Sequence, residues 1–110
     1  MARLRFRKLQ WVGASPTGDC LFESIERTHR CAALKIPARV LIFRLSKTLS
    51  HAVCVYFPRT AAGSRALVFD SAKRVSTILP ASITETSTPQ QITHHLIAGA
   101  AECWWFEDTP

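Results

Sequence analysis

The feature that most constrains the fold of this sequence is a pair of apolar, β-rich runs separated by a short connection. Residues 49–57 and 65–70 are dominated by Val, Leu, Phe and Ala, and Pro58 and Gly63 lie in the stretch between them. Two such runs with Pro and Gly in their connection are typical of an antiparallel hairpin. The sequence therefore predicts two adjacent antiparallel strands.

A long helix is predicted before this hairpin. Residues 19–34 contain no Pro and no Gly, and a less polar stripe is formed at helical spacing by Leu21, Ile25, Thr28 and Ala32. The charged residues fall largely on the opposite side, which is the pattern of a helix that packs on one face. Pro37 disfavours helical backbone at the residue before it, so the helix is expected to end by Lys35 or Ile36.

Shorter segments complete the expected fold. They are strands at residues 3–7, 39–45 and 75–79, a helix within residues 90–101, and a final strand or packing tail at residues 103–106. A chain of 110 residues is long enough for one compact domain with a modest core. We therefore expect a single α+β domain over residues 1–110, in which a core helix packs on an antiparallel β-sheet.

Composition limits the partners that this chain is expected to have. The net charge is +6, and part of the excess is a basic run at the start, formed by Arg3, Arg5, Arg7 and Lys8. Such an end can bind nucleic acid, but beyond Phe6 it lacks the interleaved aromatic side chains of a nucleic-acid groove. No run approaches the roughly 18 apolar residues of a membrane span. Neither a nucleic-acid nor a membrane partner is expected.

The cysteines indicate a reducing environment. Cys20, Cys31, Cys54 and Cys103 are not spaced as a disulfide framework, and Cys54 lies inside an apolar strand. Reduced, partly buried thiols are therefore expected. Residues 1–10 carry too many charges for the apolar centre of a secretory leader. The expected location is cytoplasmic, with a matured secreted or periplasmic form left open.

Three residues combine the chemical groups of a nucleophile, its base and the group that orients the base. Cys20 lies in the first turn of the predicted helix, His51 opens the first hairpin strand, and Asp70 closes the second. The unpaired N–H groups and dipole of a helix start favour an anion, so we expect a lowered pKa for the Cys20 thiol. The backbone N–H of Cys20 is a candidate donor to an oxyanion.

Symmetry of the hairpin predicts how His51 and Asp70 meet. If the turn is centred between Thr60 and Ala61, His51 lies directly opposite Asp70 on the same face of the sheet. Directly opposite residues have Cβ atoms about 4.5–5.5 Å apart. A carboxylate there is expected to accept the Nδ1–H of the imidazole and hold the ring in one tautomer.

Four ordered segments carry a resemblance to a known group of enzymes. They are Thr17-Gly18-Asp19-Cys20, Ala33-Leu34-Lys35-Ile36-Pro37-Ala38-Arg39-Val40, Ser50-His51-Ala52-Val53, and Leu67-Val68-Phe69-Asp70. Together they resemble the transglutaminase-like cysteine peptidase superfamily, which has a papain-like fold, and are most similar to its bacterial members. The resemblance implies Cys20 as nucleophile, His51 as general base and acid, and Asp70 as orienting group. No cofactor and no metal are expected.

Some residues depart from that family pattern. Lys35 replaces the usual Gly before Ile-Pro, Val53 replaces a frequent Trp, and Leu21 replaces an acidic residue of the bacterial group. Only a short run precedes Cys20, where relatives shape the substrate groove. We therefore expect either a minimal version of the fold or one completed by a partner protein, with Gln10 or Trp11 as candidate oxyanion donors.

The expected activity is cleavage of a peptide or amide bond through a thioester on Cys20, with water or an amine as acceptor. The substrate is expected to be a protein or peptide. Three alternatives stay open: a leader peptidase that acts with partner proteins, an ovarian-tumour-type deubiquitinase, and a non-catalytic binding module of the same fold that docks through Trp104-Trp105-Phe106. The possible metal-ligand sets, Cys20, His29 and Cys31 or His94, His95 and Cys103, lack a familiar zinc spacing.

Overall fold

The two predicted hairpin strands form the middle of a sheet in the computed structural model, which describes residues 10–11, 19–46, 49–60, 63–71, 75–97 and 102–107. Strand β3 (Leu49–Tyr56) pairs antiparallel with β6 (Leu67–Asp70) on one side and with β2 (Ala38–Arg44) on the other. The β3 burial pattern is nearly continuous, as expected for a central strand covered on both faces. The strand expected at residues 3–7 and the basic run around it lie outside the described residues.

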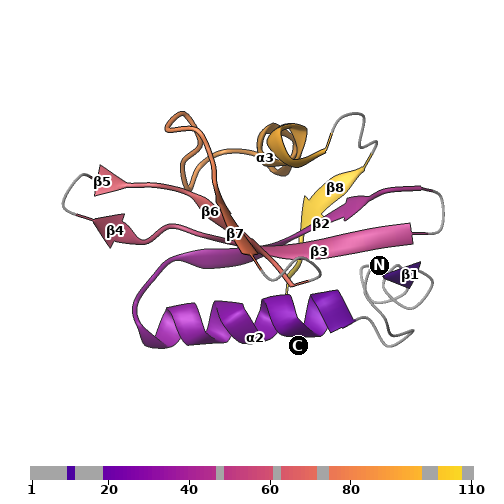
Figure 1. Ribbon diagram of the computed structural model, residues 1–110, viewed down its shortest axis with the longest axis horizontal. Helices are drawn as coiled ribbons and strands as arrows, with labels where there is room; N and C mark the ends of the chain where they lie inside the picture. Colours follow the sequence, from indigo (N-terminus) through magenta and orange to yellow (C-terminus); the bar gives the residue numbers. More distant parts are fainter. Residues whose placement is uncertain are drawn as a thin grey trace.

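Further strands extend this sheet in the order β7-β6-β3-β2-β8 (Figure 1). The outer strands are β7 (Val75–Ile78) and β8 (Cys103–Trp105), both antiparallel to their neighbours. A short β1 (Gln10–Trp11) runs parallel to the start of β3, and a two-stranded ribbon, β4 (Arg59–Thr60) with β5 (Gly63–Ser64), extends the hairpin. The final aromatic segment is thus a strand that packs in the sheet.

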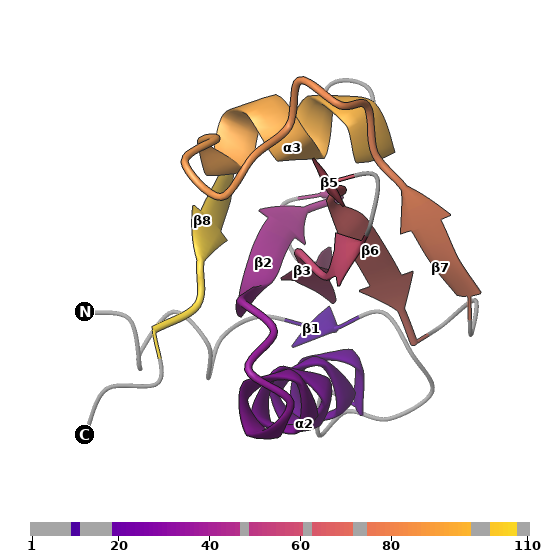
Figure 2. The ribbon, with the colours of Figure 1, turned by 90° about the vertical axis from the view of Figure 1, so that its left-hand side faces the viewer.

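The two helices of the described chain cover opposite faces of the sheet (Figures 1 and 2). Helix α2 (Asp19–Ala33) matches the predicted long helix, whereas α3 (Pro89–Leu96) begins with a Thr88–Gln91 capping box and ends earlier than expected. Neither of them is long and apolar enough to cross a membrane. The described residues therefore form a layered α+β structure with one main, almost entirely antiparallel sheet.

Alternation along the strands divides the core into two clusters. On the α2 face, Val40, Ile42 and Ala52 pack with Cys20. On the α3 face, a larger cluster contains Leu41, Phe43, Val53, Val55, Phe57, Ala66, Val68, Leu79, Ile83 and Ile92. Because successive side chains of a strand point to opposite faces, even-numbered β3 residues face α2 and odd-numbered ones face α3.

The hairpin register differs from the symmetric one predicted. Tyr56 faces Leu67 and Cys54 faces Phe69, and in the ribbon Thr60 faces Gly63. The turn is therefore centred one residue later than expected, and the partners are displaced by two. Continuing the ladder puts Asp70 level with Val53, so the prediction that Asp70 lies directly opposite His51 is wrong.

The C-terminal end of α2 closes with a Lys residue in a backbone conformation that favours Gly. Lys35 has φ 59°, and its N–H donates to Ala32 O at 3.0 Å while the N–H of Ile36 donates to Cys31 O at 2.8 Å. These two bonds with a left-handed residue between them are the Schellman pattern. Lys35 thus adopts the left-handed conformation at a cost that Gly avoids.

We predict that Lys35→Gly raises the free energy of unfolding by about 0.5–1 kcal/mol, because it relieves the left-handed strain at the helix end. The measurement is urea denaturation followed by circular dichroism. Ala33→Gly, at the last helical residue, is the matched control and is expected to lower stability by up to about 1 kcal/mol. A loss of stability in both variants would contradict the assignment of Lys35 as the left-handed cap.

Candidate active site

Among the described residues, the start of α2 docks between two ladders on one edge of β3. The described β1 residues pair with Leu49 and Ser50, and the β6 ladder begins at Cys54, so Ala52 lies between the two ladders. The Ser24 hydroxyl, fully buried, donates to Ala52 O at 3.2 Å, and the Ala52 N–H faces the Cys20 thiol. Since both backbone groups of one strand residue point to the same edge, α2 side chains occupy the place of a neighbouring strand here.

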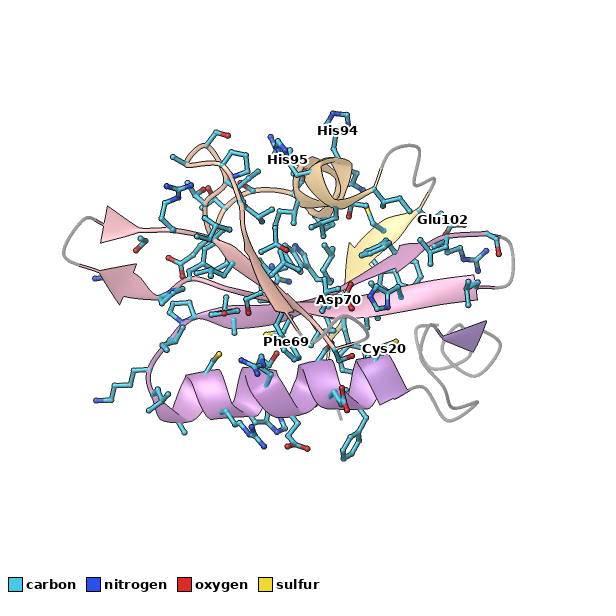
Figure 3. All side chains as sticks on the ribbon, in the orientation of Figure 1. Cys20, Phe69, Asp70, His94, His95 and Glu102 are labelled. Atoms are coloured by element: carbon cyan, nitrogen blue, oxygen red, sulfur yellow. The ribbon has the colours of Figure 1, made fainter. Side chains whose placement is uncertain are left out.

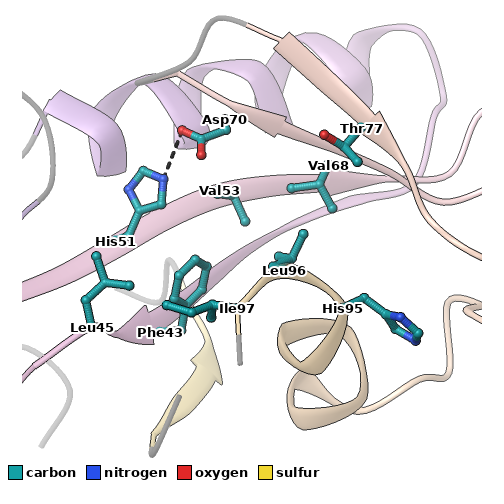
Figure 4. Close-up of a pocket in the computed structure, with 10 residues that line it drawn as sticks. All are labelled: Phe43, Leu45, His51, Val53, Val68, Asp70, Thr77, His95, Leu96 and Ile97. Atoms are coloured by element: carbon teal, nitrogen blue, oxygen red, sulfur yellow. Dashed lines mark ion pairs between the residues drawn. The ribbon is translucent and has the colours of Figure 1, made fainter. Parts of the chain in front are cut away.

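His51, which is buried, and Asp70, which is partly exposed, form a pair across β3 and β6. The Nε2 atom of His51 lies 2.9 Å from Oδ1 of Asp70, and the His51 side chain is 6% exposed (Figure 4). The two-residue displacement of the hairpin makes this a diagonal contact, which an imidazole is long enough to bridge. The expected contact exists, but it uses Nε2 rather than the predicted Nδ1.

The second ring nitrogen of His51 is buried without a hydrogen-bond partner in the described part of the chain. Phe43 packs edge-on against the ring, with centroids 5.6 Å apart, and Figure 4 shows Nδ1 turned away from Val53 and the rest of the cavity. When Nε2–H donates to the carboxylate, the neutral ring carries its lone pair on Nδ1. In this orientation, the unprotonated Nδ1 of His51 is available to accept a proton.

Cys20 lies in the first turn of α2 and is 1% exposed (Figure 3). Burial raises the pKa of its thiol, and the negative charge of Asp70 raises it further. The backbone N–H groups of Ala52, Leu21 and Cys20 stabilise the thiolate and act in the opposite direction. Because desolvation is the largest of these effects, the expected lowering of the Cys20 pKa by the helix start is wrong for this structure.

The three candidate residues thus gather around one stretch of β3, but from different sides. Cys20 approaches from the α2 face beside Ala52, the residue that follows His51. His51 and Asp70 line a cavity of about 400 Å³ on the α3 face. Since Nδ1 of His51 has no partner among the described residues, it is not hydrogen-bonded to the thiol in this structure.

The cavity beside His51 is mostly apolar and was not predicted from the sequence. It lies between the sheet and α3 (Figure 4), and the residues that line it are Phe43, Leu45, His51, Val53, Val68, Asp70, Thr77, His95, Leu96 and Ile97. Ser24 was also missed. Its position four residues after Cys20 and four before Thr28, on the same side of the helix, is the signal that marks it as a side chain facing the sheet.

The sequence also raised expectations about the cysteines, a metal site and oxyanion donors. Cys20, Cys31 and Cys54 are buried free thiols, and Cys103 is a partly buried one. Within the described ranges, no three His, Cys, Asp or Glu side chains lie close enough together to hold a metal ion. Gln10 and Trp11 form β1 beside the start of β3, but their side chains, as candidate oxyanion donors, lie outside what the structure describes.

Comparisons with models of protein families, with curated proteins and with solved structures return no match for this chain. The site is therefore interpreted from the geometry and chemistry of its own residues.

We predict that Asp70→Ala lowers the free energy of unfolding by about 1–3 kcal/mol, because the buried Nε2–H of His51 loses its acceptor. Asp70→Asn keeps an oxygen at this position and is expected to lose less. Urea denaturation at neutral pH measures both. Equal losses in the two variants would show that the bond to Nε2 is not what Asp70 contributes.

A second prediction concerns Cys54, which donates to or accepts from the Thr28 hydroxyl at 3.4 Å. Burial raises the pKa of Cys54 from 9.0 to about 11. Well below pH 9 the Cys54 thiol is neutral in both the folded and the unfolded chain. As pH rises toward and past 9, the thiol ionises first in the unfolded chain, so the free energy of unfolding falls. This group is expected to account for a loss of about 2–3 kcal/mol between pH 9 and about 11.

The measurement is urea denaturation at several pH values for the wild type and for Cys54→Ala. The variant lacks the thiol, so its free energy of unfolding should decline less steeply over this range. Parallel declines in the two proteins would contradict the raised pKa.

Proposed function

We propose that this chain is a thiol-dependent acyl-transfer enzyme, a cysteine peptidase or acyltransferase that uses Cys20, His51 and Asp70. The observation that carries the proposal is the state of the His51 ring, which holds Nε2 on Asp70 and leaves Nδ1 buried without a partner in the described chain. An imidazole fixed in this way is poised to accept a proton. The proposed nucleophile is Cys20, whose thiol faces the backbone of Ala52, the residue that follows His51.

The proposed reaction has two acyl-transfer steps. The reaction requires Nδ1 of His51 and the Cys20 thiol, which approach β3 from opposite faces in this structure, to come together when substrate binds. His51 Nδ1 then takes the proton of the Cys20 thiol, and the thiolate attacks the carbonyl carbon of a peptide or amide bond. The C–N bond breaks, the amine leaves with the proton that His51 returns, and a thioester remains on Cys20. Water, or a second amine, then attacks the thioester with His51 again as base, and the thiol is restored.

The arrangement of elements supports a minimal papain-like or transglutaminase-like fold for this activity. A cysteine opens the helix on one face of the sheet, a histidine lies on the central strand β3, and an aspartate ends the antiparallel strand β6. This is the order of elements that the resemblance of the four sequence segments implies.

A second candidate function is favoured by the burial of Cys20. A side chain 1% exposed, packed with Val40, Ile42 and Ala52, contributes to the core like any small apolar residue. In a non-catalytic binding module of this fold, the His51–Asp70 pair and the apolar cavity would serve recognition. For the enzyme, in contrast, the atoms that cover the Cys20 sulfur must move when substrate binds.

The discriminating experiment incubates the protein with a mixed peptide library, with and without a fluorescent primary amine, and detects cleavage or amine incorporation by mass spectrometry. Cys20→Ala and His51→Ala are expected to lower turnover by about 10³-fold or more, and Asp70→Ala to leave weak residual activity. Cys103→Ala, which removes a partly buried thiol on β8, is the control and should keep full activity.

Turnover that survives Cys20→Ala would refute the thioester mechanism. Peptide binding by the wild type without any turnover, unchanged in Cys20→Ala, would favour the binding module instead.

A further inference from the structure

Ser50 carries a buried hydroxyl that takes no part in the hydrogen bonding of the described residues. The residue is 0% exposed, and its Oγ has no hydrogen-bond partner in the described part of the molecule. A buried hydroxyl without a partner costs about 1–3 kcal/mol, so its presence calls for an explanation. The β2–β3 ladder runs without a bulge from Ala38–Tyr56 to Arg44–Ser50. Alternation therefore directs Ser50 toward α2, on the face that Ala52 and Cys54 share.

The spacing of α2 against β3 sets Ser50 at the level of Cys20. Ser24 donates to the carbonyl of Ala52. Thr28, four residues further along α2, contacts Cys54, two residues further along β3. The helix and the strand thus run in step, since four helical residues rise about 6.0 Å and two strand residues about 6.6 Å. Moving back by four residues along α2 from Ser24 and by two along β3 from Ala52 therefore brings Cys20 level with Ser50. The Cys20 thiol faces the N–H of Ala52, on the Ser50 side of that residue.

A second donor beside Ser50 also lacks an acceptor. Arg44 faces Ser50 across the β2–β3 ladder and so shares its face. Its Nε atom is buried without a partner among the described atoms, while its Nη1 lies 3.6 Å from Glu102. Neighbouring donors with no acceptor between them are suited to a negative charge that forms only when Cys20 ionises.

We propose that the Ser50 hydroxyl donates a hydrogen bond to the Cys20 sulfur once that sulfur becomes a thiolate. The inference rests on the proposed function, because it gives Ser50 a part in forming the nucleophile. The proton of the thiol goes to Nδ1 of His51, and Ser50 keeps its own proton as the donor of the new bond. Ser50 therefore opposes two effects that disfavour the thiolate, burial and the charge of Asp70 on β6.

The test reads the ionisation of Cys20 directly and needs no substrate. Cysteine labelled with ¹³C at Cβ is introduced, and the Cys20 resonance is followed from about pH 6 to about 11, because the Cβ shift reports thiol ionisation. Ser50→Ala is expected to raise the titration midpoint by about one pH unit, the size expected when a charged acceptor loses one hydrogen bond. The midpoint of urea unfolding should stay the same or rise, since no existing bond is lost.

The matched control is Thr93→Val. Thr93 on α3 is also buried, 2% exposed, and its hydroxyl has no partner among the described residues, but it packs on the opposite side of the sheet from Cys20. Its variant should leave the Cys20 midpoint unchanged. Ser50→Cys, with a weaker donor of similar shape, should raise the midpoint by a smaller amount and replaces Ser50→Ala if that variant does not fold.

An unchanged Cys20 midpoint in folded Ser50→Ala, or an equal change in Thr93→Val, would overturn the assignment of Ser50. Absence of peptide turnover in the wild type would bear only on the proposed function, because the titration is independent of it.

Discussion

The arrangement of this protein depends on one contact, the docking of the start of α2 against the backbone of Ala52. The sheet leaves Ala52 between the ladders of β1 and β6, and buried polar backbone groups need partners. Ser24 supplies a donor for the carbonyl, and the Cys20 thiol faces the N–H. The same contact that satisfies the strand therefore brings the helix start, with its cysteine, beside the residue that follows His51.

Burial has two opposing effects at this site. It holds the His51 ring in one orientation beside Asp70, with an unpartnered Nδ1 in the described structure. It also raises the pKa of Cys20, which makes the thiolate harder to form. The donors available to offset that cost are the backbone N–H groups of the helix start and, in our proposal, the Ser50 hydroxyl.

The elements of the fold were predictable because each has a strong local pattern. The helix at residues 19–34 and the strands at 49–57 and 75–79 differ from the observed elements by only a residue or so. The end of α3 was not predicted, since its periodicity continues past Leu96 while the helix ends at the extended Ile97. The meeting of His51 with Asp70 was anticipated, but the register and the ring nitrogen that make it were not.

The sequence by itself determined the order of helix and strands, and therefore which chemical groups lie at their ends: a thiol, an imidazole and a carboxylate. Local periodicity and turn residues are sufficient for that. Only the tertiary structure decided the two-residue displacement of the hairpin and the contact of His51 with Asp70 through Nε2. It also decided the burial of Cys20 and of Ser50. These depend on where the turn is centred and how α2 steps along β3, which are set by packing between segments far apart in the chain.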